Sequence, residues 1–391
     1  MQTMEYGTSL MSQQQKMEEL ESLKSVDSAS NRLNRFAIEQ DDIIYLPEDD
    51  AEVDLYKIMK ITKDLKSNLT VIKSMSRQEI KMLVTLFYQL QELRKATKNQ
   101  LRAIEDDEKK KGNTQVLTWI LQNFAVSEIG IRDCLHLIAE NSEVGQWLTQ
   151  IIGIGDVLAA GLIAHFDVTG KKYATQFISY AGLNDNNRPW IGEEKANQII
   201  EEVLTNENGK PKKTITDDDV VQIAIKSQWK YEYLVEKAFD QEKQKWDKQK
   251  LKKAIKKIPY NKNLKTLMYK VGSSFHWNCN KPNSLYGKLL SERRVYEEKL
   301  NAEGAYAEQA EAGAKRVKKD TVAYKYYKEG VLPPGHIIMR AMRYSEKIFI
   351  SHLFEEMYRV KYREVPPRFY TLEHLEGHHK DIAPEVPFTE V

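Results

Sequence analysis

The most concentrated chemical feature of this sequence is a lysine-rich stretch, residues 243–270. It holds eleven lysines and a single acidic residue, Asp247. Apolar residues recur in it at helical spacing, so one helix face should be buried while the ammonium groups stay in water. A dense cationic face is typical of proteins that contact nucleic-acid phosphates, and a plain solvated helix face is the alternative. The predicted phosphate contacts are Lys250, Lys252, Lys253, Lys256, Lys257, Lys262 and Lys265.

Aromatic and further basic residues follow this stretch. Phe275 and Trp277 come directly after it. Unpaired bases stack on exposed aromatic side chains, so Trp277 is predicted to contact nucleic acid, and burial in a core is the alternative. Residues 315–328 again mix lysine, arginine and tyrosine. Arg340 and Arg343 lie on the polar side of a predicted helix that runs to about residue 360, and we predict that they contact phosphate.

A pair of glycines marks a second kind of phosphate site. Gly153 and Gly155 flank one apolar residue between two apolar, helix-like segments. Glycine permits a tight turn, and the free N–H groups at a helix start can hold a phosphate. We therefore predict a helix-hairpin-helix turn with phosphate contacts, and a plain tight corner is the alternative. Lys171 and Lys172 follow downstream and join the predicted contacts.

Residue types suited to catalysis occur without completing a site. His374 and His378 are four apart, with His379 adjacent, but no cysteine or carboxylate cluster completes a metal centre. The aspartates of residues 41–54 lie in a polar stretch without strands, whereas a two-metal site needs carboxylates converging from separate elements. The sequence therefore predicts no catalytic residue, no metal and no cofactor.

The elements that would position these residues are helical throughout. Over residues 53–108 one set of positions repeats at alternating three- and four-residue steps, which predicts a coiled-coil seam. A helix around residues 55–72 is available to pair with it, and an ordinary two-helix packing unit is the alternative. The seam positions are Ile80, Leu83, Phe87, Leu90, Arg94, Thr97, Leu101 and Ile104.

We predict an all-α fold: a long helical coiled-coil arm followed by a Nop-like, helix-hairpin-helix domain. Two cysteines indicate a reducing compartment, and we see neither a signal peptide nor an apolar run long enough to cross a membrane. The predicted segments are a weakly structured N-terminus (1–52), the arm (53–112), the core (113–192), an acidic insertion (193–242), a basic helical part of the core (243–362) and a tail (363–391), whose histidine-containing stretch, residues 373–379, is predicted to be disordered.

Part of the sequence resembles a known family. The glycine turn followed by Tyr180-Ala181-Gly182-Leu183 is similar to the C-terminal domain of bridge-RNA-guided insertion-sequence transposases. Residues 263–269, 285–290 and 340–343 resemble later blocks of that domain. The hairpin behind a coiled-coil arm also resembles the Nop domain of box C/D ribonucleoproteins.

The departure from those transposases concerns their N-terminal RuvC-like nuclease. Only about 50 residues precede the arm, and they supply no strands for such a domain. An RNA-guided core without a nuclease resembles the nuclease-less Tas proteins of tandem-interspaced guide RNA (TIGR-Tas) systems. This resemblance implies a cytoplasmic ribonucleoprotein of a prokaryotic or phage-infected cell, a homodimer through its arms, in which a guide RNA pairs with target DNA without cleavage.

Two alternatives remain open. One is a divergent transposase or recombinase core that uses a serine nucleophile, with Ser273, Ser274 and Ser284 in the relevant region, or a nuclease supplied in trans. The other is an RNA-free structural DNA-binding protein.

Overall fold

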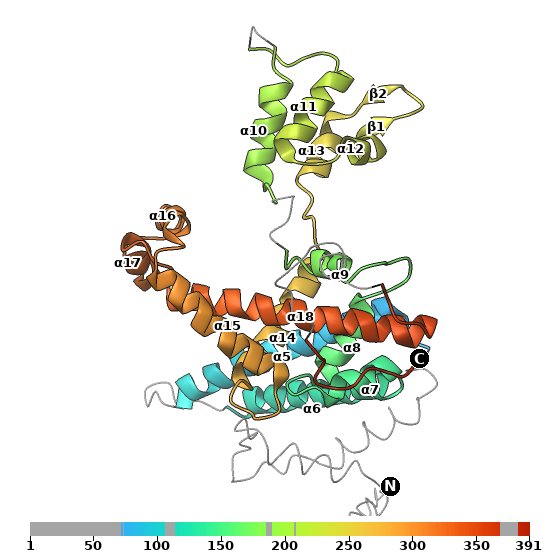
Figure 1. Ribbon diagram of the computed structural model, residues 1–391, viewed down its shortest axis with the longest axis vertical. Coiled ribbons are helices and arrows are strands. Elements are labelled where there is room, and N and C mark those ends of the chain that lie inside the picture. Colours follow the sequence, from blue (N-terminus) through green and yellow to red (C-terminus); the bar gives the residue numbers. More distant parts are fainter. Residues whose placement is uncertain (1–71, 73, 106–113, 185–189, 207–208, 368–381) are drawn as a thin grey trace, which may run out of the picture. The chain divides into compact units, whose positions relative to one another are not determined.

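The computed structural model describes residues 72, 74–105, 114–184, 190–206, 209–367 and 382–391 (Figure 1). These residues form an all-α structure with one two-stranded hairpin, as the sequence predicts. No helix among them has the length and apolar character needed to cross a membrane. The elements are α5 (Arg77–Glu105), α6 (Gln115–Glu140), α7 (Glu143–Gln150), α8 (Asp156–His165), α9 (Thr175–Tyr180), α10 (Glu193–Val203), α11 (Asp217–Ser227), α12 (Tyr231–Ala238), β1 (Phe239–Asp240), β2 (Lys245–Trp246), α13 (Lys248–Ile255), α14 (Lys262–Trp277), α15 (Leu285–Ala302), α16 (Ala307–Ala314), α17 (Val322–Lys328) and α18 (Pro334–Tyr362).

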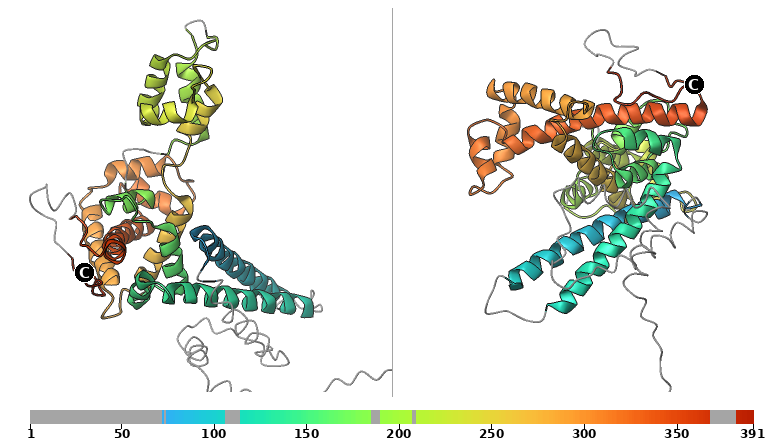
Figure 2. Two further views of the ribbon diagram at one scale, coloured as in Figure 1. Left: turned by 90° about the vertical axis from the view of Figure 1, so that its right-hand side faces the viewer. Right: turned by 90° about the horizontal axis from the view of Figure 1, so that it is seen from below.

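Helices α5 and α6 lie side by side as a hairpin (Figure 2). Phe87 and Leu101 of the predicted seam are buried. Arg94, the charged residue at a seam position of α5, forms an ion pair with α6: its Nε atom lies 2.7 Å from the Glu128 carboxylate. The partner of α5 in the described structure is therefore α6. The predicted partner, residues 55–72, lies outside the described residues except for Ile72, as do the aspartates of residues 41–54.

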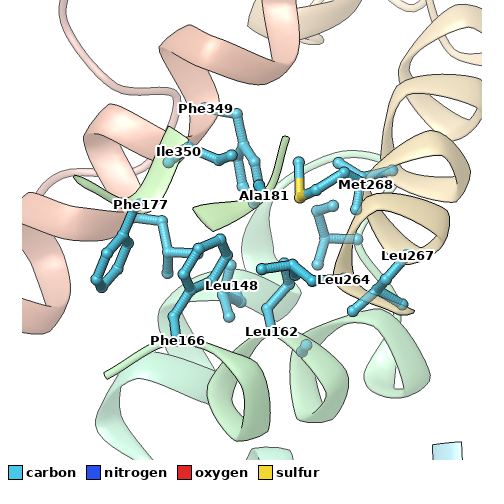
Figure 3. Packing of buried hydrophobic residues seen from close by; sticks show 14 of the residues in the cluster. Leu148, Leu162, Phe166, Phe177, Ala181, Leu264, Leu267, Met268, Phe349 and Ile350 are labelled. Carbon is cyan, nitrogen blue, oxygen red and sulfur yellow. The ribbon is translucent and has the colours of Figure 1, made fainter. Parts of the chain in front are cut away.

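The main hydrophobic core is built around the predicted hairpin of α7 and α8, with α9, α14 and α18 packed on it (Figure 3). Small side chains let the helices approach closely: a Cβ atom on Gly161 would lie 2.9 Å from a methyl carbon of Leu267 in α14. Aromatic rings fill the remaining space, as in the stacked pair Phe166 and Phe177, whose centroids are 4.4 Å apart. This core fixes where α14 lies.

Residues 190–257 form a module with a hydrophobic core of its own. The module contains α10 to α13 and the β1–β2 hairpin, and it begins where the predicted acidic insertion begins. The predicted boundary at residue 242 is wrong, because the residues beyond it supply core side chains to the module. Those side chains are Trp246, Leu251, Ala254 and Ile255.

A third, small cluster joins the end of α15 to α16, α17 and the start of α18. At its centre the Glu297 carboxylate is almost fully buried. It accepts hydrogen bonds from Arg293 and Arg340 at 2.9 and 2.6 Å and from the Tyr306 hydroxyl at 2.5 Å. A buried carboxylate held by two guanidinium groups resists rearrangement, because losing a partner would leave an uncompensated charge.

The C-terminal residues 382–391, which end the predicted tail, pack on the core. The Trp147 indole N–H donates to the Val386 carbonyl at 3.1 Å, and its ring stacks on Phe388. The Thr389 hydroxyl donates to the buried Glu356 carboxylate at 2.6 Å. Apolar and hydrogen-bonding side chains in this otherwise polar tail explain the docking. The histidines at 374, 378 and 379 lie outside the described residues.

Candidate nucleic-acid interface

Helix α14 divides cleanly into a buried and an exposed side. Leu264, Met268, Val271 and Phe275 are fully buried in the main core. The opposite side exposes Lys262, Lys265, Tyr269 and Trp277, which we call the α14 face. These positions recur at helical spacing, so they lie on one side of the helix. Of the two predicted aromatics, Phe275 belongs to the core and Trp277 faces solvent.

The two aromatic residues of the α14 face expose much of their surface. The Trp277 side chain is 82% exposed and Tyr269 is 52% exposed. The flat faces of these two rings are accessible and suit stacking on bases. Ammonium groups on the same side complement a polyanion. The α14 face therefore combines the two features that single-stranded nucleic acid requires.

The motif Tyr180-Ala181-Gly182-Leu183 positions the start of α14. The Asn261 backbone N–H donates to the Tyr180 carbonyl at 2.9 Å, and its side chain donates to the Tyr180 hydroxyl at 2.7 Å. The same Asn261 side chain caps α14 by accepting from the Leu264 N–H at 3.0 Å. Gly182 has φ +71°, and a Cβ there would overlap the Tyr260 ring at 2.7 Å. Lys265 lies over that ring, 4.3 Å from its centroid. The motif thus fixes where α14 begins and, through the Tyr260 ring, where the Lys265 side chain lies.

The lysines of α13 and of the turn that follows it belong to the separate module, where acidic residues partly neutralise them. The Lys256 ammonium pairs with Glu193 of α10 at 3.1 Å. This hydrogen bond and charge, with a contribution from Lys252, lower the pKa of the Glu193 carboxyl below its ordinary value. Lys257 lies over the Tyr233 ring. Lys250 and Lys253 are exposed. The cationic side of α13 is present, but part of its charge is balanced within the chain.

The glycine turn adopts the predicted tight geometry, with Gly153 at φ +97°. Two of its backbone donors bind within the chain: the Ile152 N–H donates to Glu385 at 2.6 Å and the Ile154 N–H to the Ile151 carbonyl at 3.0 Å. The Gly153 carbonyl accepts from the Ser274 hydroxyl of α14 at 2.6 Å. The turn thus serves as a packing corner. Phosphate contact at the exposed Gly155 stays a prediction.

The other predicted contacts are spread over the chain. Lys171 and Lys172 are exposed in the loop between α8 and α9. Arg340 is engaged by Glu297, and its guanidinium lies over the Tyr306 ring at 4.2 Å. That engagement gives Arg340 a structural role. Arg343 is half-buried on α18, near the buried carboxyl of Glu346.

The candidate serine nucleophiles all form hydrogen bonds with backbone atoms. Ser273 and Ser274 donate to the carbonyls of Tyr269 and Gly153, and the Ser284 hydroxyl caps α15 by accepting from the Gly287 N–H. Within the part of the chain that the structure describes, no group of three or more histidine, cysteine or acidic residues could hold a metal ion.

Comparison of the chain with known protein families, curated proteins and solved structures gives no match. The interface therefore rests on the geometry of its residues. Sequence reasoning missed Tyr269 of the α14 face, and it missed Glu385, whose carboxylate holds the glycine turn. Tyr269 could have been found, because it lies eight residues before Trp277 on the same predicted helix face. Glu385 carried no signal, because its two backbone partners, Ile152 and Leu285, are distant in sequence.

Proposed function

We propose that this chain binds nucleic acid through the α14 face, and that its physiological ligand is a small guide RNA that it pairs with target DNA. The observation that carries the proposal is the exposure of Trp277 and Tyr269 among lysines on a helix whose other side is anchored in the main core. A rigid helix presents these groups at fixed spacing. Bases can then stack without the protein first having to order the backbone of this helix.

The strength of this interface follows from its parts. Stacking on one aromatic residue contributes about 1–3 kcal/mol per base, so two stacked bases contribute about 2–6 kcal/mol. Each phosphate that a lysine neutralises adds a salt-dependent term. Stacking does not select a base, so sequence recognition would come from pairing between the bound RNA and its target. That division of labour suits a protein that holds a guide.

The rest of the proposal follows from the resemblance and from the serine contacts. Binding occurs without strand cleavage, the protein acts in the cytoplasm of a prokaryotic or phage-infected cell, and copies pair through the α5–α6 hairpin. The absence of cleavage in this proposal is supported by the hydroxyls of Ser273, Ser274 and Ser284, each of which forms a hydrogen bond with a backbone atom.

Purification of the full chain from cells that carry its native locus, followed by sequencing of the bound RNA, tests the proposal. We expect a defined small RNA, and we expect a variant with Trp277→Ala and Tyr269→Ala to lose it. Random fragments, retained equally by both proteins, would show that the chain is not guided. Adding plasmid and Mg²⁺ to the purified complex tests cleavage, and reproducible strand breaks would favour the transposase alternative.

A further inference from the structure

A second cationic surface lies on the small cluster formed by α15 to α18. The loop between α16 and α17 exposes Arg316, Lys318 and Lys319, which we call the α16–α17 loop patch. Lys325 and Lys328 on α17 are also exposed. The one acidic residue within the loop is Asp320. None of these residues belongs to the α14 face, so the proposed function does not account for this second cationic surface.

The loop is held in a defined conformation. The Arg316 N–H donates to the Gly313 carbonyl at 3.0 Å, and the Thr321 N–H and hydroxyl both donate to the Lys318 carbonyl, at 3.2 and 2.7 Å. The Thr321 hydroxyl also caps α17 by accepting from Tyr324. Below the loop, the Glu297 network fixes the cluster to α15 and α18. The charges are therefore presented on a rigid support, which reduces the entropy lost on binding.

The patch lacks a stacking surface. The tyrosines of α17 are half-buried, and Tyr327 packs against Gly313, where a Cβ would lie 2.7 Å from its ring. Its hydroxyl lies 3.4 Å from the His336 ring. With aromatic rings turned inward and guanidinium and ammonium groups turned outward, the patch suits the phosphate backbone of a duplex, which offers no unpaired bases.

We propose that the α16–α17 loop patch contacts the backbone of a duplex that adjoins the nucleotides stacked on the α14 face. This inference rests on the proposed function. Helix α15 connects the two surfaces: it begins shortly after Trp277 and ends just before α16. Its 18 residues span roughly 27 Å at 1.5 Å per residue. At about 3.4 Å per base pair, that length corresponds to roughly eight base pairs.

The test compares two ligands with the full chain. One is an RNA single strand of about six nucleotides, enough to occupy stacking residues alone. The other adds an RNA–DNA hybrid of about twelve base pairs, which exceeds the length of α15. The variant carries Arg316→Gln, Lys318→Gln and Lys319→Gln. The matched control replaces three exposed lysines of the separate module, Lys195, Lys210 and Lys213, with glutamine.

We expect the loop variant to bind the short strand like the unmodified chain. It should bind the longer ligand roughly tenfold more weakly, with a salt slope reduced by roughly two to three for three lost phosphate contacts. The module control should leave both affinities unchanged.

Three results separate the possible failures. If the loop variant binds the longer ligand normally while Trp277→Ala weakens the short strand, the patch inference is wrong and the proposed function stands. If neither ligand binds the unmodified chain, the proposed function itself fails. If the loop variant keeps hybrid binding but loses binding to phosphatidylserine vesicles, the partner of the patch is a membrane surface and the inference is overturned.

Discussion

Glu346 provides the most quantitative prediction, because its carboxyl group is buried where α18 crosses α14. The residue is 3% exposed, and a Cβ on Gly272 of α14 would overlap its carboxyl group. Burial raises the pKa of Glu346 from 4.5 to about 8, although the nearby charges of Arg343, Lys265 and Lys347 oppose this shift. The folded chain therefore keeps a proton on Glu346 at neutral pH, whereas the unfolded chain loses it.

The sign of the pH dependence follows directly. Between pH 4.5 and 8 the folded state binds more protons than the unfolded state, so the free energy of unfolding falls as pH rises, and the contribution is constant above pH 8. Over the 2.5 pH units from about 5 to 7.5, at about 1.36 kcal/mol per unit, the loss is about 3 kcal/mol. Glu346→Gln replaces the carboxyl group with an amide that does not titrate in this range, and so removes this pH dependence.

Thermal unfolding measured from pH 5 to 8 tests the reasoning. A difference of about 3 kcal/mol corresponds to roughly 6–12 °C in Tm for a core of this size. The melting temperature of Glu346→Gln should exceed that of the unmodified chain by this amount near pH 7.5, and the two should converge near pH 5. Replacement of the exposed Glu364 by glutamine is the control. Parallel curves for Glu346→Gln and the unmodified chain would refute the assignment of a buried, protonated carboxyl.

Three further predictions concern binding and the docked tail. Trp277→Ala should weaken binding of single-stranded RNA by about 1–3 kcal/mol, roughly 5- to 150-fold in a filter-binding assay. Replacement of Trp119 on α6, which is also exposed, by alanine should not weaken binding, and equal losses would place stacking elsewhere. Glu385→Ala should lower stability by about 1–3 kcal/mol in urea unfolding, because two backbone N–H groups lose their acceptor, while Glu390→Ala should be neutral. Glu193→Gln frees Lys256 but should leave the affinity for RNA at low salt unchanged, because the proposed binding surface is the α14 face; a severalfold gain would place the lysines near α13 on the binding surface.

The sequence by itself determined the helical class and the local geometry of the turns. The helix predicted to run to about residue 360 ends close to the observed end of α18 at Tyr362, because burial of one helix side imposes a regular apolar period. Gly153 and Gly155 predict a tight turn because few residues tolerate that backbone. These signals are local, so a single sequence carries them.

Only the tertiary structure decided which predicted residues share a surface. The lysines of residues 243–270 form one run in the sequence, yet the chain folds those of α13 into a separate module and leaves Lys262 and Lys265 on the main core. The sequence predicts Arg340 as a phosphate contact, but in the structure its guanidinium donates to Glu297, which is distant in sequence. Charge and exposure depend on partners brought together by long-range packing, and periodicity does not encode those partners. The physical reason is that the apolar periodicity of a helix indicates which of its sides is buried, whereas the residues that pack on that side come from distant parts of the sequence.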